Sequence, residues 1–166
     1  MVTWRWLAAS LALAVPAGSL VAQHKPTAPP LPPARAPAAE RVAERGTIAP
    51  GDTVRDSLTR RDVLLRTENT YAQQWRLAGH AGQTITIDLT SDAFDAYVFL
   101  LGPGFETATP QDDDSGGRCN ARLTARLPKT GDYVIVVTTS DRLATGPFTL
   151  TVATGPRATS LVPCNR

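Results

Sequence analysis

The segment that decides the fold reads Gln83-Thr-Ile-Thr-Ile-Asp-Leu-Thr90. Its apolar residues, Ile85, Ile87 and Leu89, alternate strictly with polar ones. Because successive side chains of a β-strand point to opposite faces, this alternation predicts a strand with one buried and one hydrated face. The buried face needs a second apolar surface to pack against, so at least two layers are expected.

Segments of the same character lie on both sides of this strand, separated by turns rich in glycine, proline and aspartate. The expected strands are residues 73–78, 95–101, 121–127, 133–138 and 148–152, with weaker candidates at 53–58 and 63–66. No sustained helical period follows Gly46. Seven to nine short strands are typical of two packed sheets. We therefore predict an all-β antiparallel sandwich of seven to nine strands.

The first 22 residues have the layout of an export signal. A single arginine, Arg5, precedes an apolar run over residues 6–15, and small residues follow the run up to Ala22. The run is shorter than the roughly 20 residues that span a bilayer. We expect a Sec-type signal peptide at residues 1–22, not a lipoprotein signal, with a retained anchor as the alternative. The remaining chain is then secreted, periplasmic or part of the cell envelope, without a membrane span in the mature chain.

Residues 23–45 are expected to be a Pro/Ala-rich linker. Six of the twelve residues from 26 to 37 are proline, which excludes helix and sheet and favours an extended spacer. The charged residues 40–45 could form one helical turn before Gly46 ends it. The sandwich is placed at residues 46–154, and residues 155–166 remain as a C-terminal tail.

Composition narrows the classes of function. The 166 residues include 17 Lys and Arg against 15 Asp and Glu, which gives a formal net charge of +2. So small a net charge does not favour nucleic acid as a partner, because phosphate binding requires clustered basic residues. Arg122 and Arg126 share one face of an expected strand and could contact a polyanion, but a hydrated sheet face explains them more simply.

The two cysteines, Cys119 and Cys164, are the only thiols of the chain. In an exported protein a disulfide between them is the default expectation. It would close a span of 45 residues and tie the C-terminal tail back onto the sandwich. A redox role is not favoured because no Cys-x-x-Cys spacing occurs, and two cysteines are too few for a structural zinc site.

Five aspartates are the candidate metal ligands: Asp92, Asp95, Asp112, Asp113 and Asp114. Calcium takes six to eight oxygen ligands, which two acidic loops and backbone carbonyls could provide. The run from Asp112 does not fit an EF-hand, because Leu123 stands at the twelfth position, where a glutamate is needed. The favoured alternative is that these carboxylates accept backbone N–H bonds in turns. Calcium is the one cofactor that the sequence suggests.

The residues available for catalysis are few. His80 is the only histidine of the expected sandwich and lies in a turn between glycines, without a Gly-x-Ser-x-Gly motif. We therefore expect a hydrated turn residue and a protein that is not an enzyme. Trp75, Tyr97, Phe99 and Tyr133 could form a platform for a glycan or peptide, but their phase with aliphatic residues predicts core packing.

Five motifs, taken in order, resemble the bacterial pre-peptidase C-terminal domain. They are WRLAGHAGQTITIDL at 75–89, SDAFDAYVFLLGP at 91–103, DDDSGG at 112–117, LPKTGDYVIVV at 127–137 and GPFTLTV at 146–152. The resemblance implies a jelly-roll-like β-sandwich, similar in fold to the collagen-binding domains of clostridial collagenases, and a non-catalytic exported module. The chain departs from the family at Pro147-Phe148, where many members have a tyrosine, and no host enzyme accompanies the module in this sequence.

Together these observations predict a secreted, non-catalytic module that binds an extracellular protein or polysaccharide, such as a collagen-like polymer, a peptide or a glycan. The alternative function is a structural or chaperone-like accessory of a co-secreted peptidase encoded elsewhere. A hydrolase is the weakest alternative. Neither the identity of the ligand nor the oligomeric state follows from the sequence.

Overall fold

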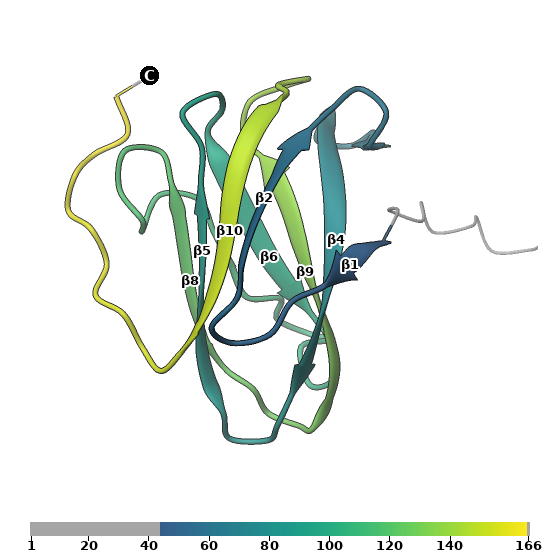
Figure 1. Cartoon of the computed structure of the whole chain (residues 1–166), viewed down its shortest axis with the longest axis vertical. Coiled ribbons are helices and arrows are strands. Elements are labelled where there is room, and N and C mark those ends of the chain that lie inside the picture. The colour runs from purple at the N-terminus through teal and green to yellow at the C-terminus, as the bar shows by residue number, and fades with distance from the viewer. Residues whose placement is uncertain (1–43, 166) are drawn as a thin grey trace, which may run out of the picture. The chain divides into compact units, whose positions relative to one another are not determined.

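The computed structural model describes residues 44–165, so the expected signal peptide and nearly all of the expected linker lie outside the described residues. Ten strands form two sheets that pack face to face (Figure 1). The six-stranded sheet contains β1 (Glu44–Thr47), β3 (Val63–Leu65), β4 (Thr70–Gly79), β6 (Ala96–Leu101), β7 (Gln111–Asp112) and β9 (Gly131–Thr139). The four-stranded sheet contains β2 (Thr53–Leu58), β5 (Thr84–Thr90), β8 (Ala121–Arg126) and β10 (Gly146–Thr154).

The strand order confirms the predicted all-β sandwich. The six-stranded sheet runs β1-β4-β9-β6-β7, with β3 also beside β4, and the four-stranded sheet runs β2-β10-β5-β8. All pairs are antiparallel except β1 and β4, which are parallel. Residues 44–165 contain no helix, and therefore none that could cross a membrane.

The two strands that the sequence did not indicate, β1 and β7, are short edge strands. Residues 44 and 45 belong to β1 and not to a helical turn, so the helical expectation for them is wrong. The Glu44 carboxylate accepts two hydrogen bonds of 2.8 Å from the Arg76 guanidinium of β4. These bonds lower the pKa of Glu44 below its ordinary value. A cross-strand ion pair thus helps to place a strand that has no apolar alternation.

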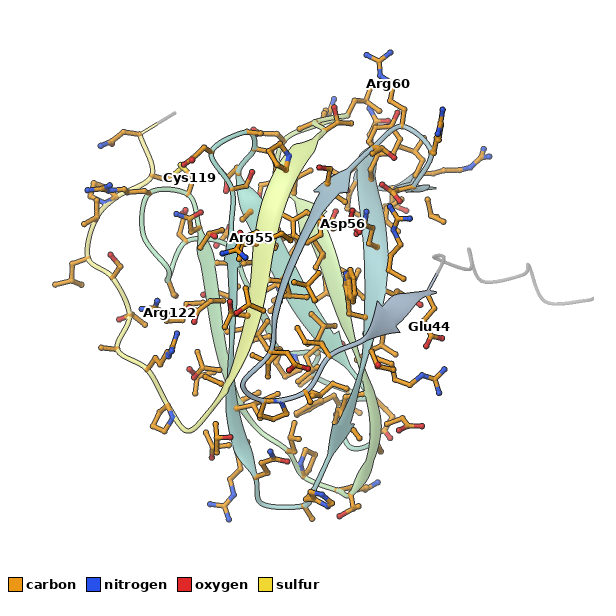
Figure 2. All side chains as sticks on the ribbon, viewed as in Figure 1. Glu44, Arg55, Asp56, Arg60, Cys119 and Arg122 are labelled. Atoms are coloured by element: carbon orange, nitrogen blue, oxygen red, sulfur yellow. A yellow bond between two sulfur atoms is a disulfide. The ribbon has the colours of Figure 1, made fainter. Side chains whose placement is uncertain are left out.

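The core lies between the sheets and follows the alternation that the sequence predicted. Ile85, Ile87 and Leu89 of β5 are completely buried. Tyr133 of β9 is also completely buried, and its hydroxyl donates a 2.6 Å hydrogen bond to the Lys129 carbonyl. This bond spans the turn that precedes β9 and resembles the tyrosine corner of other two-sheet β-proteins. Side chains of both sheets fill the space between the ribbons (Figure 2).

Candidate functional site

The outer face of the six-stranded sheet carries aromatic and aliphatic side chains. In β6, Ala96, Val98 and Leu100 belong to the core, so the side chains of Tyr97, Phe99 and Leu101 point outward. Phe99 packs there beside residues of β3, β4 and β9 in a second, small apolar cluster. A sheet face exposed to water usually carries polar side chains, so this face is unusual.

These side chains line an open groove of about 390 Å³, called here the aromatic groove. Its apolar part is formed by Leu65, Tyr97, Phe99 and Leu101, and its polar part by Glu68, Thr70, Thr109, Gln111, Thr138 and Thr139. A volume of this order suits a few residues of a partner and falls in the range of ordinary ligand sites.

The geometry of the aromatic pair is that of a notch and not of a flat platform. The ring centroids of Tyr97 and Phe99 lie 6.0 Å apart, with their planes inclined by 53°. The Tyr97 hydroxyl donates a 2.7 Å hydrogen bond to Gln111 Oε1, which holds the ring in place. Burial, and then the negative charges of Asp113 and Glu68, raise the pKa of the Tyr97 hydroxyl. The groove therefore combines an apolar floor with an acidic rim.

Sequence reasoning predicted the environment of only two of the four aromatic residues correctly. Core packing is confirmed for Trp75 and Tyr133, which are 8% and 0% exposed. It is wrong for Tyr97 and Phe99, which face outward and are half-buried. The sequence of β6 did not distinguish core-facing from outward-facing residues, because both faces of the strand carry apolar residues. Alternation identifies two faces but does not show which of two apolar faces meets the core.

The five candidate calcium ligands do not all lie together. The Asp112 carboxylate accepts hydrogen bonds from the backbone N–H groups of Ser115, at 3.0 Å, and Arg122, at 2.8 Å. This is the turn role that the sequence offered as the alternative to calcium. Asp113 is exposed near the aromatic groove, and Asp92 is exposed in a separate open groove of about 450 Å³ beside the four-stranded sheet.

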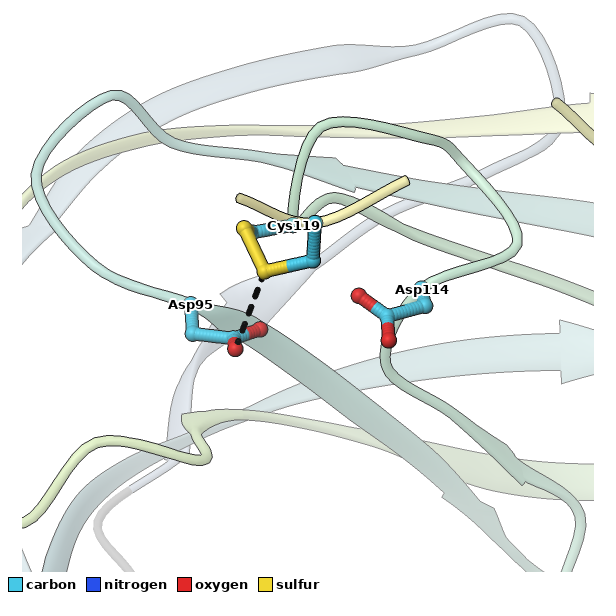
Figure 3. Close-up of side chains that lie close together, drawn as sticks. Asp95, Asp114 and Cys119 are labelled. Atoms are coloured by element: carbon cyan, nitrogen blue, oxygen red, sulfur yellow. Dashed lines mark hydrogen bonds between the residues drawn. A yellow bond between two sulfur atoms is a disulfide. The ribbon is translucent and has the colours of Figure 1, made fainter. Parts of the chain in front are cut away.

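The structure does bring Asp95 and Asp114 together, next to the disulfide (Figure 3). One oxygen of each carboxylate and the sulfur atoms of Cys119 and Cys164 all lie within 4.8 Å of one another. The sulfur atoms are bonded to each other, as the sequence predicted, and are therefore not thiolate ligands. Asp95 Oδ2 lies 3.6 Å from Cys164 Sγ. Calcium binding stays a prediction, with these two carboxylates as the pair that could share an ion.

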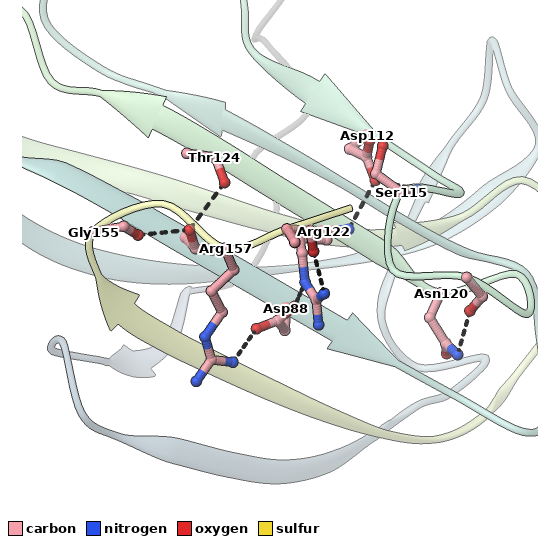
Figure 4. A network of polar contacts seen from close by, with 11 residues as sticks. Asp88, Asp112, Ser115, Asn120, Arg122, Thr124, Gly155 and Arg157 are labelled. Carbon is pink, nitrogen blue, oxygen red and sulfur yellow. Dashed lines mark hydrogen bonds and ion pairs between the residues drawn. The ribbon is translucent and has the colours of Figure 1, made fainter. Parts of the chain in front are cut away.

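The C-terminal tail, residues 155–165, returns from β10 past β8 (Figure 1) and is held there by an ion-pair cluster. Asp88, which is 7% exposed, accepts hydrogen bonds from Arg122 Nε at 2.5 Å and Arg157 Nη1 at 2.7 Å (Figure 4). Arg122 Nη1 also donates a 2.6 Å hydrogen bond to the Ala158 carbonyl. Arg122 thus secures the tail, a role that neither expectation for it, the polyanion contact or the hydrated face, included.

His80 is exposed in the turn between β4 and β5, the position that the sequence predicted for it. Its backbone N–H donates a 3.0 Å hydrogen bond to Gln83 Oε1, which closes the turn. The side chain of Gln83 and the backbone of His80 therefore stabilise a hairpin connection.

The described residues form a β-sandwich with an open groove on the outer face of one sheet. No protein-family model and no curated protein matches the chain. Among solved structures, the pre-peptidase C-terminal domain of a collagenase from Bacillus anthracis is similar, with a TM-score of 0.49 and 16% identity over 68% of this chain and 98% of that one.

Two further similar structures are periplasmic inhibitors of g-type lysozyme. The one from Aeromonas hydrophila has a TM-score of 0.47 and 19% identity over 68% of this chain and 100% of that one. The one from Salmonella Typhimurium has a TM-score of 0.46 and 13% identity over 66% of this chain and 97% of that one. At these identities the likeness concerns the fold alone.

Proposed function

We propose that the protein is an exported, non-catalytic binding module that holds an extended segment of an extracellular protein in the aromatic groove. One observation carries this proposal: Tyr97, Phe99 and Leu101 point outward on a sheet face that normally faces water. Apolar surface of this kind, surrounded by polar groups, is typical of interaction sites.

The groove suits a polypeptide better than a glycan. Sugar rings stack on the open face of an aromatic ring, whereas the inclined rings of Tyr97 and Phe99 leave a notch that fits a single aliphatic or proline side chain. The amide of Gln111 and the exposed Thr109 hydroxyl at the rim can bind peptide N–H and C=O groups. The charge of Glu68 favours a basic residue next to the apolar one.

The disulfide supports the exported location. Structural disulfides persist in oxidising compartments outside the cytoplasm, and Cys119–Cys164 joins segments 45 residues apart. The expected signal peptide, which lies outside the described residues, points to the same location. A proline-rich, collagen-like segment bearing a lysine or arginine is the ligand chemistry that fits the groove.

Direct binding measurements test the proposal. A collagen-like Pro-Pro-Gly repeat peptide and a single-chain proline-rich peptide that ends in arginine would be titrated against the oxidised protein by calorimetry, with chitohexaose as the glycan probe. We expect Tyr97→Ala and Phe99→Ser each to weaken peptide binding by about 10-fold or more, as for central interface anchors. Thr149→Ala, on the outer face of the opposite sheet, is the matched control and should bind normally.

Each outcome has a distinct meaning. Peptide binding that survives both groove substitutions would place the site elsewhere and refute the proposal. Binding of chitohexaose alone, lost in Tyr97→Ala, would identify the groove as a polysaccharide site instead. Absence of binding by all three probes would also contradict the proposal, since the groove would then lack the expected ligand chemistry.

A further inference from the structure

The outer face of the four-stranded sheet carries a row of polar side chains. Arg55 of β2, Thr149 of β10 and Thr90 of β5 lie side by side, because the register pairs Arg55 with Thr149 and Thr149 with Thr90. In each of these strands the residue next to the polar one packs in the core. Since successive side chains of a strand point to opposite faces, all three polar side chains point outward, and Arg55 is among the labelled residues of Figure 2.

This row lines the open groove of about 450 Å³ that also contains Asp92, and we call it the polar groove. Asp92 comes from the loop after β5, and Asn120 from the residue before β8. The apolar part of the lining is small, because Phe148 is only 3% exposed. The polar groove therefore differs in chemistry from the aromatic groove, which lies on the other sheet.

Hydrogen bonds fix the loops at one end of the polar groove. Asn120 Oδ1 accepts a 2.9 Å hydrogen bond from the N–H of Ser91, and Asn120 Nδ2 donates a 2.8 Å bond to the Gly117 carbonyl. The Ser91 hydroxyl donates a 2.9 Å bond to the Pro147 carbonyl. A site whose walls are already fixed loses little conformational entropy when a ligand binds.

Four other groups in the polar groove are available to a ligand. Within residues 44–165, the Arg55 guanidinium and the Asp92 carboxylate form no ion pair, either with each other or with other side chains. The hydroxyls of Thr90 and Thr149 lie between the two strands that carry these charges or next to them. Arg55 and Thr90 are two strand spacings apart, or about 10 Å between their Cα atoms. The groove thus offers a cation, two hydroxyls and a carboxylate over the length of an extended ligand.

These groups select the chemistry of the ligand. The planar guanidinium binds a carboxylate through two parallel hydrogen bonds, and threonine hydroxyls and a carboxylate bind hydroxyl groups. A peptide would find little apolar surface for its side chains here, and a densely sulfated polymer would bring further anions close to Asp92. A chain of hydroxyl-rich rings with one carboxylate per ring meets neither obstacle.

We propose that the polar groove binds an acidic saccharide made of uronic acids. One sugar carboxylate lies on Arg55, and sugar hydroxyls bind the two threonines and Asp92. The polar groove and the aromatic groove share no lining residue, so the inference does not depend on the proposed function.

Calorimetric titration of the oxidised protein with tetragalacturonic acid tests the inference, and the methyl ester of the same tetrasaccharide supplies the uncharged counterpart. We expect the acid to bind and the ester to bind at least 10-fold more weakly. Arg55→Gln should weaken binding of the acid by about 10- to 100-fold, the range for a lost hydrogen-bonded charge. Arg60→Gln, which removes the same charge from an exposed arginine outside the groove, is the matched control and should bind normally.

Further variants locate the saccharide. Asp92→Asn should weaken binding, and Tyr97→Ala in the aromatic groove should leave it unchanged. Arg55 and Asp92 are exposed, so their substitution removes no core packing. The inference is overturned if tetragalacturonic acid does not bind, if its ester binds as tightly, or if Arg55→Gln and Arg60→Gln weaken binding equally. It is also overturned if Tyr97→Ala abolishes binding, or if a heparin tetrasaccharide binds more tightly than tetragalacturonic acid.

Discussion

The ring of Tyr133 is packed between two glycines, and adding one methyl group at either should destabilise the fold by a calculable amount. A Cβ on Gly102 would overlap Tyr133 Cδ1 and lie 2.9 Å from Cγ and Cε1. A Cβ on Gly79 would overlap Leu127 Cδ1 and lie 3.0 Å from Cδ2 and Cε2 of Tyr133. The ring cannot move aside easily, because its hydroxyl is bonded to the Lys129 carbonyl.

The three glycines Gly51, Gly79 and Gly102 separate two causes of destabilisation. Gly51 has a φ of 101° and open space around it, so Gly51→Ala reports backbone strain alone, about 1 to 2 kcal/mol. Gly79 lies outside the left-handed region, so Gly79→Ala reports overpacking alone, about 1 to 3 kcal/mol. Gly102 has a φ of 152° as well as the overlap, so Gly102→Ala should destabilise the fold by about 2 to 5 kcal/mol, the sum of the two effects.

Equilibrium unfolding in urea, followed by circular dichroism with the disulfide intact, measures the three losses. The slope of the free energy against urea should stay constant, so that midpoint changes report stability. If Gly102→Ala were no more destabilising than Gly51→Ala, the contact with Tyr133 would contribute nothing to the loss of stability at residue 102. If Gly79→Ala were neutral, the core would be able to rearrange around the ring, and the packing argument would be wrong for both sites.

Three further predictions concern the disulfide, the groove and calcium. Replacing Cys119 and Cys164 by serine should lower the free energy of unfolding by up to about 4 kcal/mol, because the disulfide closes a span of 45 residues. An unchanged urea midpoint would show that the other contacts of the tail maintain the stability without the disulfide. The raised pKa of the Tyr97 hydroxyl should appear in an ultraviolet or NMR pH titration as deprotonation above the ordinary tyrosine range. Glu68→Gln should lower this pKa, because the Glu68 carboxylate disfavours the phenolate. An unaltered titration in the variant would show that the charge of Glu68 does not raise the pKa. Calcium binding predicts a higher thermal midpoint in millimolar calcium than in EDTA, and Asp114→Asn should abolish this difference. Equal midpoints would indicate that the carboxylates of the acidic loops only accept backbone hydrogen bonds in turns.

The local sequence pattern was sufficient to predict a strand and its buried face wherever apolar and polar residues alternate within that strand. The alternation of Ile85, Ile87 and Leu89 determined both a strand and its buried face, because a side-chain period of two is a property of the strand alone. The pairing of Cys119 with Cys164 also followed from the sequence, since two cysteines allow only one disulfide within the chain. Repeated alternation over many short segments was then enough to predict a two-sheet sandwich.

Contacts between distant segments decided the rest. Only the tertiary structure shows that Tyr97 and Phe99 face outward, because the packing of β6 beside β9, and not the composition of β6, selects which apolar face meets the core. Arg122 holds the tail because the fold brings β5, β8 and residues 157–158 next to one another. Such contacts join residues more than 30 positions apart, and local alternation, which fixes only the two faces of a single strand, carries no information about them.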